Sequence, residues 1–149
     1  MRILIVIFAL LVNFNFFAQS GKIDSYINKL DNSQFKIAHG SAATFSVNSP
    51  AAFKLIKKGK RAEKKLVAAL SDSTKAIMAH WILCHIQFKT VSFAGPKTVF
   101  TSNGNLLKYY LGEEKGEGLI ISENESHYLF VELKDLEKIK NYWTKKMKG

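Results

Sequence analysis

The side chains best suited to chemistry are few, and three of them lie close together in one run of the chain. His80 and Cys84 are four positions apart, and His85 follows directly. In a helix this spacing places His80 and Cys84 on one face, where they could bind zinc or copper, or act as nucleophile and base. The other histidines, His39 and His127, are distant in sequence. A structural zinc needs four ligands and a reactive thiolate needs exposure. We therefore expect Cys84 to be a core residue flanked by rim histidines, with neither a metal site nor a catalytic site.

Carboxylates gather in two polar segments, and one of these segments also contains a histidine. The first group is Glu113, Glu114 and Glu117, and the second is Glu123 and Glu125 beside His127. Paired carboxylates can do acid–base work, so a small hydrolase with His127 or His80 as its base is one hypothesis. Carboxylates in turns between Gly, Ser and Asn are usually solvated, however, and their spacing does not match a calcium loop. The chain also has no phosphate-binding glycine loop, nucleophile elbow or zinc-protease helix motif, and we expect no cofactor.

The strongest surface feature is a basic cluster in the first half of the chain. Its members are Lys57, Lys58, Lys60, Arg61, Lys64 and Lys65. The whole chain carries 22 basic and 12 acidic residues, a formal net charge of +10. Such a surplus favours anionic partners, which could be an acidic protein or an anionic envelope surface. Aromatic residues do not alternate with these charges, so we expect no nucleic-acid partner.

The first residues have the pattern of a cleavable export signal. Arg2 precedes an apolar run over residues 3–12, and Ala18 offers a small residue at which cleavage can occur. The run is shorter than the roughly 20 apolar residues that span a bilayer, so we expect no stable membrane span after cleavage. We predict a signal peptide over residues 1–18 and a periplasmic or extracellular mature protein. With Cys84 as its only cysteine, the mature chain has no internal disulfide, and its fold depends on apolar packing.

Apolar spacing predicts helices in the first half of the mature chain. The predicted ranges are 22–30, 50–58, 61–70 and 74–88. Ser49 and Pro50 form a helix start, and Gly59 forms a helix end. We expect Phe53, Ile56 and Ala52 to form the buried stripe of the second helix. The fourth helix is apolar nearly all round, which predicts a place at the centre of the core.

The second half of the chain has the alternation and turn signals of an antiparallel sheet. Strands are predicted over residues 97–102, 105–111, 118–122 and 128–132, with Asn103-Gly104 as a two-residue hairpin turn. A helix over 134–147, with Leu136, Ile139, Trp143 and Met147 as its apolar stripe, covers one face of this meander. The conformation of residues 31–48 stays open, with a strand or a loop at residues 44–47. The sequence thus predicts one α+β domain over residues 19–149, with a helical part (21–90), a strand part (97–132) and a closing helix.

One stretch of the helical part resembles a known family. Residues 50–88, and above all AAFKLIKKGKRAEKKLVAALSDSTKAIMAHWILCHI at 51–86, resemble a fragment of HEAT-type helical repeats. The resemblance rests on the glycine-then-basic linker, the LVAALSD helix end, and the inward Ala79, Leu83 and Ile86 of the next helix. It implies a stacked helix pair of the kind that forms protein-binding surfaces. The chain as a whole resembles exported bacterial proteins.

These observations lead to one leading hypothesis and two alternatives. The leading hypothesis is a non-catalytic exported interaction protein that uses its basic surface to bind a protein or an anionic envelope component. The first alternative is the small exported hydrolase with a histidine-based site, for which the distinguishing observation is a pocket that brings a histidine next to a carboxylate or Cys84. The second alternative is an inhibitor or immunity-type partner of a secreted protein.

Overall fold

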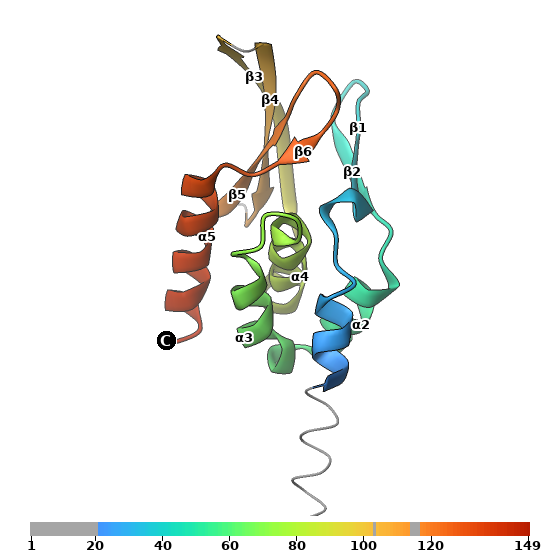
Figure 1. Cartoon of the computed structure of the whole chain (residues 1–149), viewed down its shortest axis with the longest axis vertical. Helices are drawn as coiled ribbons and strands as arrows, with labels where there is room; N and C mark the ends of the chain where they lie inside the picture. The colour runs from blue at the N-terminus through green and yellow to red at the C-terminus, as the bar shows by residue number, and fades with distance from the viewer. Residues whose placement is uncertain (1–20, 103, 114–116) are drawn as a thin grey trace, which may run out of the picture.

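A computed structural model describes residues 21–102, 104–113 and 117–149, in which helices and antiparallel sheets are combined (Figure 1). The predicted signal peptide, Asn103 of the predicted hairpin turn and Glu114 of the first carboxylate group lie outside the described residues. Helices form one part of the molecule, a four-stranded sheet forms another, and a helix at the C-terminus packs against both (Figure 1). The predicted α+β arrangement is therefore confirmed at the level of helices, strands and their order.

The helical part contains α2 (Pro50–Lys58), α3 (Lys60–Ala69) and α4 (Ala76–Phe88), preceded by helical residues 21–27. Ser49 caps α2 through its Oγ, which accepts a hydrogen bond from the Ala52 amide 3.3 Å away. Gly59 separates α2 from α3 with a φ of +58°, a conformation that favours glycine. Every residue of α4 from Ala76 to Cys84 is buried, so this helix is the centre of the core as predicted. No helix in the described part of the chain combines the length and apolar character needed to cross a membrane.

The predicted inner face of α2 is wrong in one position. Phe53 is 47% exposed, whereas Ala51, Ala52 and Leu55 are buried. Ala51 and Leu55 stand four positions apart and face α4, which turns Phe53 to the flank of the helix. There its ring meets the edge of Trp81, with the ring centroids 5.9 Å apart.

The four-stranded sheet is an antiparallel meander of β3 (Ser92–Thr101), β4 (Gly104–Gly112), β5 (Gly118–Glu123) and β6 (Leu129–Phe130). The first strand begins at Ser92 instead of Lys97, because the chain passes through Gly95-Pro96 with a register shift and stays paired with β4. The last strand is much shorter than the predicted range of residues 128–132.

One face of the sheet is buried beneath helices. Tyr109 pairs with Ile121 and Leu111 with Leu119, and these side chains are at most 1% exposed. Helix α4 contacts β4 and β5, and α5 (Leu133–Lys146) packs beside them against β5 and α3. The predicted stripe of α5 is buried at Leu136, Ile139 and Trp143, while Met147 lies beyond the helix and is 37% exposed.

A separate hairpin occupies the segment that the sequence left open. After a short turn, η1 (Asn32–Gln34), β1 (Phe35–Ala38) pairs with β2 (Thr44–Val47) in an antiparallel register. Phe35 stacks on Phe45 with ring centroids 5.0 Å apart, and both rings contact Phe93 of β3. Phe93 in turn stacks on Tyr109 at 5.6 Å. This column of aromatic rings holds the hairpin against the main sheet.

Candidate functional site: a histidine–glutamate cluster

The centre of the site is Glu123, the last residue of β5. Leu119, Ile121 and Glu123 alternate along the strand, so the carboxylate shares the inward face with two core side chains. In the register of the sheet Tyr109 is the diagonal neighbour of Glu123, and its hydroxyl donates a hydrogen bond to Oε2 at 2.6 Å. Glu123 is only 3% exposed. The expectation that this carboxylate is solvated in a turn is therefore wrong.

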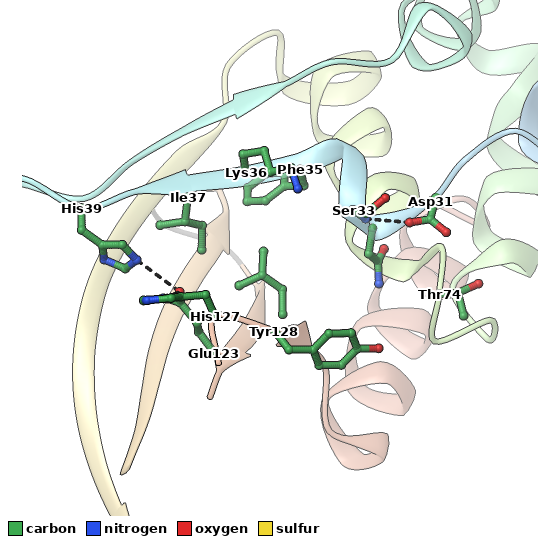
Figure 2. A pocket seen from close by; sticks show the side chains of 12 residues that line it. Asp31, Ser33, Phe35, Lys36, Ile37, His39, Thr74, Glu123, His127 and Tyr128 are labelled. Carbon is green, nitrogen blue, oxygen red and sulfur yellow. Dashed lines mark hydrogen bonds and ion pairs between the residues drawn. The ribbon is translucent and has the colours of Figure 1, made fainter. Parts of the chain in front are cut away.

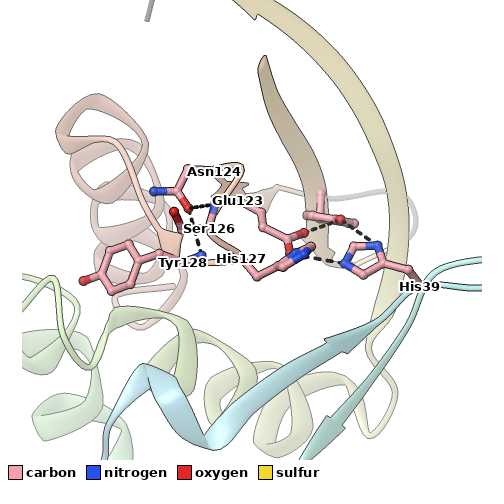
Figure 3. Close-up of polar contacts among 7 residues, drawn as sticks. His39, Glu123, Asn124, Ser126, His127 and Tyr128 are labelled. Carbon is pink, nitrogen blue, oxygen red and sulfur yellow. Dashed lines mark hydrogen bonds and ion pairs between the residues drawn. The ribbon is translucent and has the colours of Figure 1, made fainter. Parts of the chain in front are cut away.

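The tight turn after β5 brings His127 back over Glu123. Asn124 Oδ1 accepts hydrogen bonds from the amides of Ser126 and Tyr128, at 3.0 and 2.9 Å (Figure 3). This Asx-type turn holds His127 at a φ of +59°, in the left-handed region that non-glycine residues rarely adopt. His127 Nδ1 then lies 2.7 Å from Glu123 Oε1.

The second histidine comes from the β1–β2 hairpin, far away in sequence. His39 follows the last residue of β1 and extends toward the end of β5 (Figures 2 and 3). Its Nε2 lies 3.2 Å from Glu123 Oε1, and its Nδ1 lies 3.5 Å from the Tyr109 hydroxyl oxygen. The aromatic column at Phe35, Phe45 and Phe93 fixes the hairpin and thereby places His39 at the site.

The hydrogen bonds around Glu123 decide its charge. Burial on its own would raise the pKa of the carboxyl, but hydrogen bonds from Tyr109, His127 and His39 outweigh burial and hold the pKa below its usual value. Tyr109 shows the reverse effect, since burial and the neighbouring carboxylate raise the pKa of its hydroxyl, which stays protonated as a donor. The site therefore contains a buried anion with an imidazole on either side.

Three possible metal ligands converge at this point. One nitrogen each from His39 and His127 and one oxygen of Glu123 lie within 4.8 Å of one another. Two imidazoles and a carboxylate form a ligand set that suits divalent transition metals. The two distances to Oε1, 3.2 and 2.7 Å, approach the separation of about 3.3 Å between ligand atoms in a tetrahedral site with bonds of about 2.0–2.1 Å.

A pocket of about 550 Å³ opens beside the cluster (Figure 2). Its lining combines the three cluster residues with residues from η1 and its N-cap, β1, the α3–α4 loop and the β5–β6 turn, including Asp31, Ser33, Lys36, Thr74 and Tyr128. The side chains of His127 and His39 are 73% and 40% exposed, so both rings are accessible from this side. A small molecule in the pocket can reach the cluster.

The predicted group at His80 and Cys84 is a structural element. His80 is fully buried, so its predicted place at the rim is wrong. Trp143 Nε1 can only donate and lies 2.9 Å from His80 Nδ1, so Nε2 carries the proton and donates to the Leu111 carbonyl at 2.7 Å. Burial lowers the pKa of His80 to about 4 and raises that of Cys84, as predicted a core residue, to about 12. The Trp143 N–H occupies the lone pair of the His80 imidazole and the Cys84 thiol is un-ionised, so the pair provides neither base nor nucleophile here.

The predicted basic cluster forms an exposed surface on α2 and α3. Lys57, Lys60, Arg61 and Lys64 are exposed, and Lys58 is half-buried. Lys65 is partly exposed and forms an ion pair with Asp24 at 2.5 Å. Glu63, which lies between these basic residues in the sequence, is buried and accepts a hydrogen bond from Gln87.

Two of the other predicted carboxylates, Glu117 and Glu125, have partners outside the site. Glu117 forms an ion pair with Lys138 on α5 at 2.8 Å, and Glu125 accepts a hydrogen bond from the Asn105 amide at 3.2 Å. Local sequence patterns do not identify His39 as a site residue, because its hairpin has weak alternation and meets Glu123 only in the folded chain. The available signal was the alternation of Leu119, Ile121 and Glu123, which marks a carboxylate on a core-facing register.

No family model, no curated protein and no solved structure matches this chain.

Proposed function

We propose that the protein binds a divalent transition metal ion of the zinc class through His39, Glu123 and His127. The observation that carries this proposal is the convergence of three ligand atoms within 4.8 Å around a buried, ionised carboxylate. A cation between the two imidazoles and the carboxylate would balance the negative charge of Glu123. Without such an ion, hydrogen bonds from Tyr109, His127 and His39 stabilise this charge. The bound ion would also connect the β1–β2 hairpin to the β5–β6 turn.

The ligand types favour zinc-class ions over calcium or magnesium. Calcium and magnesium prefer sets of oxygen ligands, whereas imidazole suits zinc, copper and nickel. Tyr109 supports the same assignment, because its hydroxyl holds Oε2 of Glu123 and leaves Oε1 directed at the histidines. Hydrogen bonds of this kind around a metal ligand typically strengthen metal binding.

The test is metal titration of the tag-free mature chain. We expect one equivalent of Zn²⁺ to bind by calorimetry, and one equivalent of Co²⁺ to produce the visible absorption of a four-coordinate site. The substitutions His39→Ala, His127→Ala and Glu123→Gln should each weaken binding at least about tenfold. His85→Ala is the matched control, since His85 packs against Trp81 away from the cluster. Equal binding by the His127→Ala protein would refute the proposal.

A second candidate function uses the exposed basic cluster on α2 and α3. An exported interaction protein could bind an acidic protein or an anionic envelope surface through Lys57, Lys60, Arg61 and Lys64, all of which face solvent. The resemblance of residues 50–88 to HEAT-type repeats is consistent with protein binding by these helices. This candidate does not depend on the metal site, and both functions can coexist in one exported protein.

Salt dependence tests this second candidate. The mature chain should bind vesicles rich in phosphatidylglycerol at 50 mM NaCl and release them at 300 mM, since screening weakens exposed charges. The triple substitution Lys57→Glu, Lys60→Glu and Lys64→Glu should abolish binding. A matched control reverses Lys145, Lys146 and Lys148 at the C-terminus, so that the change in net charge is the same. Equal loss in both triple variants would show attraction by net charge alone.

We also propose that the protein is exported. The predicted signal over residues 1–18 would deliver the mature chain to the periplasm or the cell exterior. Mass spectrometry of the natural protein should find an N-terminus at or just after residue 19. A protein that retains Met1 or Arg2 in a soluble intracellular fraction would exclude export.

A further inference from the structure

We infer that the metal ion at His39, Glu123 and His127 holds a water molecule in an open position and hydrolyses small esters that enter the adjoining pocket. The inference rests on the proposed metal binding and adds an activity to it. Three observations carry it: the number of ligands, the side from which the site is accessible, and the lining of the pocket.

The number of ligands matches a catalytic site and not a structural one. Among the described residues, the cluster within ligand distance has three members. Structural zinc sites are closed by four protein ligands, whereas hydrolytic zinc sites use three and leave the fourth position to water. Asp31, the other carboxylate in the pocket lining, is engaged by the Ser33 amide at 2.7 Å. Asp31 is therefore held within a local turn at the pocket wall.

The open position faces the pocket. Glu123 and Tyr109 form the buried side of the cluster, and their polar groups are directed at each other. Both histidine rings are exposed on the opposite side, where the pocket of about 550 Å³ begins (Figure 2). This volume lies within the usual range of about 300–1,000 Å³ for small-molecule sites. Water and a small substrate can therefore approach the ion from the pocket.

The reaction needs no redox partner and no protein nucleophile. A metal-bound water loses a proton to solvent, and the resulting hydroxide attacks the carbonyl carbon of the ester. The new C–O bond forms, the bond to the leaving alcohol breaks, and the leaving oxygen takes a proton from solvent. The ion stabilises the negative charge that develops on the carbonyl oxygen. This chemistry does not use the thiol of Cys84, in agreement with its burial.

The pocket also indicates a substrate class. Lys36 is exposed at the pocket wall, and within the described part of the chain it forms no ion pair. Its ammonium group can attract a substrate that carries a negative charge away from the reacting carbon. The preferred substrate is therefore a small carboxylic ester with an acidic group, and Lys36 acts by binding that group.

The experiment compares two nitrophenyl esters that differ in charge. The tag-free mature protein, loaded with one equivalent of Zn²⁺, is assayed with p-nitrophenyl acetate and with mono-p-nitrophenyl succinate. We expect turnover at least about tenfold above that of free Zn²⁺, with loss on chelation and recovery on addition of zinc. His127→Ala, which replaces a largely exposed side chain, should lose the activity. His85→Ala should keep it. Lys36→Ala should raise KM for the succinate ester about threefold or more relative to KM for the acetate ester.

A second measurement reports on the open position without turnover. Acetohydroxamate, a metal-binding carbonyl analogue, should change the visible spectrum of the Co²⁺-loaded protein by occupying the fourth position. Zinc bound at one equivalent with no spectral change and no turnover would overturn the hydrolytic inference and leave metal binding in place. Failure to bind either ion would remove the proposed function itself, and the inference with it.

Discussion

Two clusters in this molecule contain histidine, and their environments differ in one decisive respect. The cluster around His80 is fully buried and contains only neutral partners, the Trp143 indole, the Leu111 carbonyl and the Cys84 thiol. The cluster around Glu123 has a buried anion at its centre and two histidines that reach the surface. The first arrangement excludes charge, and the second holds a carboxylate anion through hydrogen bonds from three side chains.

The hydrogen bonds explain why these environments lead to different roles. Both ring nitrogens of His80 have partners inside the protein, so no lone pair or proton remains for chemistry. At the second cluster, one carboxylate oxygen is shared by His39 and His127, and a metal ion could replace the protons that now join them. A buried histidine with satisfied neutral partners stabilises a fold, whereas histidines around a buried carboxylate form a site for a cation.

Removal of the His80 side chain should destabilise the fold far more than removal of the His39 side chain. His80→Ala leaves a cavity and deprives the Trp143 N–H and the Leu111 carbonyl of their partners. The expected loss of unfolding free energy is about 4 kcal/mol, measured by urea denaturation. His39→Ala, which removes a half-exposed ring, should cost less than about 1 kcal/mol. His80→Gln should recover part of the loss, because an amide can accept from Trp143 and donate to Leu111. Equal costs for His80→Ala and His39→Ala would contradict the structural role of His80.

Lowering the pH should remove the stability contributions of the two clusters in different pH ranges. The folded pKa of His80 is lowered to about 4 from an ordinary value near 6.5, so the unfolded chain binds a proton in this range and the folded chain does not. Stability is therefore lost as the pH falls from about 6.5 to 4, by about 3 kcal/mol. Glu123 also has a lowered pKa, and its contribution is lost only below the ordinary carboxyl range near 4.5.

Urea midpoints of the wild-type and His80→Gln proteins, measured at intervals from pH 7 to pH 4, test this order. The glutamine protein should lose most of the slope between pH 6.5 and 4.5. His85, whose pKa burial also lowers, is present in both proteins and so contributes equally to each. An unchanged slope in the variant would mean that His80 does not remain neutral in the fold.

Local signals in the sequence are sufficient to predict most of the fold. Ser49, Pro50 and Gly59 mark helix boundaries through the backbone conformations they favour, and the structure has the boundaries there. The continuous apolar run of α4 identified the central helix in the same way. The β1–β2 hairpin was not predicted, because its stability comes from contact of Phe35 and Phe45 with β3, which no local pattern encodes.

The site was harder to predict than the fold for a related reason. His39 and Glu123 are separated by 84 positions, and they meet only because the aromatic column places the hairpin against the sheet. Spacing along a helix drew attention to His80 and Cys84 instead, since that pattern is visible in the sequence itself. The burial that makes α4 the core is also what removes these two side chains from chemistry.

Tyr109 offers a smaller and more selective test of the site. Tyr109→Phe keeps the ring stacked on Phe93 and removes the hydroxyl that holds Oε2 of Glu123. We expect a loss of about 1 kcal/mol in unfolding free energy and a roughly tenfold weaker affinity for Zn²⁺. Tyr110→Phe is the control, because its hydroxyl donates to the Glu113 carbonyl, outside the cluster. The tyrosine would have no role in positioning Glu123 if zinc affinity fell equally in both variants.

The smallest expected effect concerns the backbone at His127, which has a φ of +59°. Glycine usually destabilises a folded protein relative to alanine, because it increases the freedom of the unfolded chain. In the left-handed region, however, the Cβ of an L-residue costs about 1–2 kcal/mol, so the order should reverse. We expect His127→Gly to be more stable than His127→Ala by about 0.5–1 kcal/mol in urea denaturation, with zinc binding lost in both. Because both variants lack the imidazole, their difference isolates the backbone. Greater stability of the alanine variant would show that the turn carries no strain, and that the site, like the His80 cluster, adopts its geometry without conformational cost.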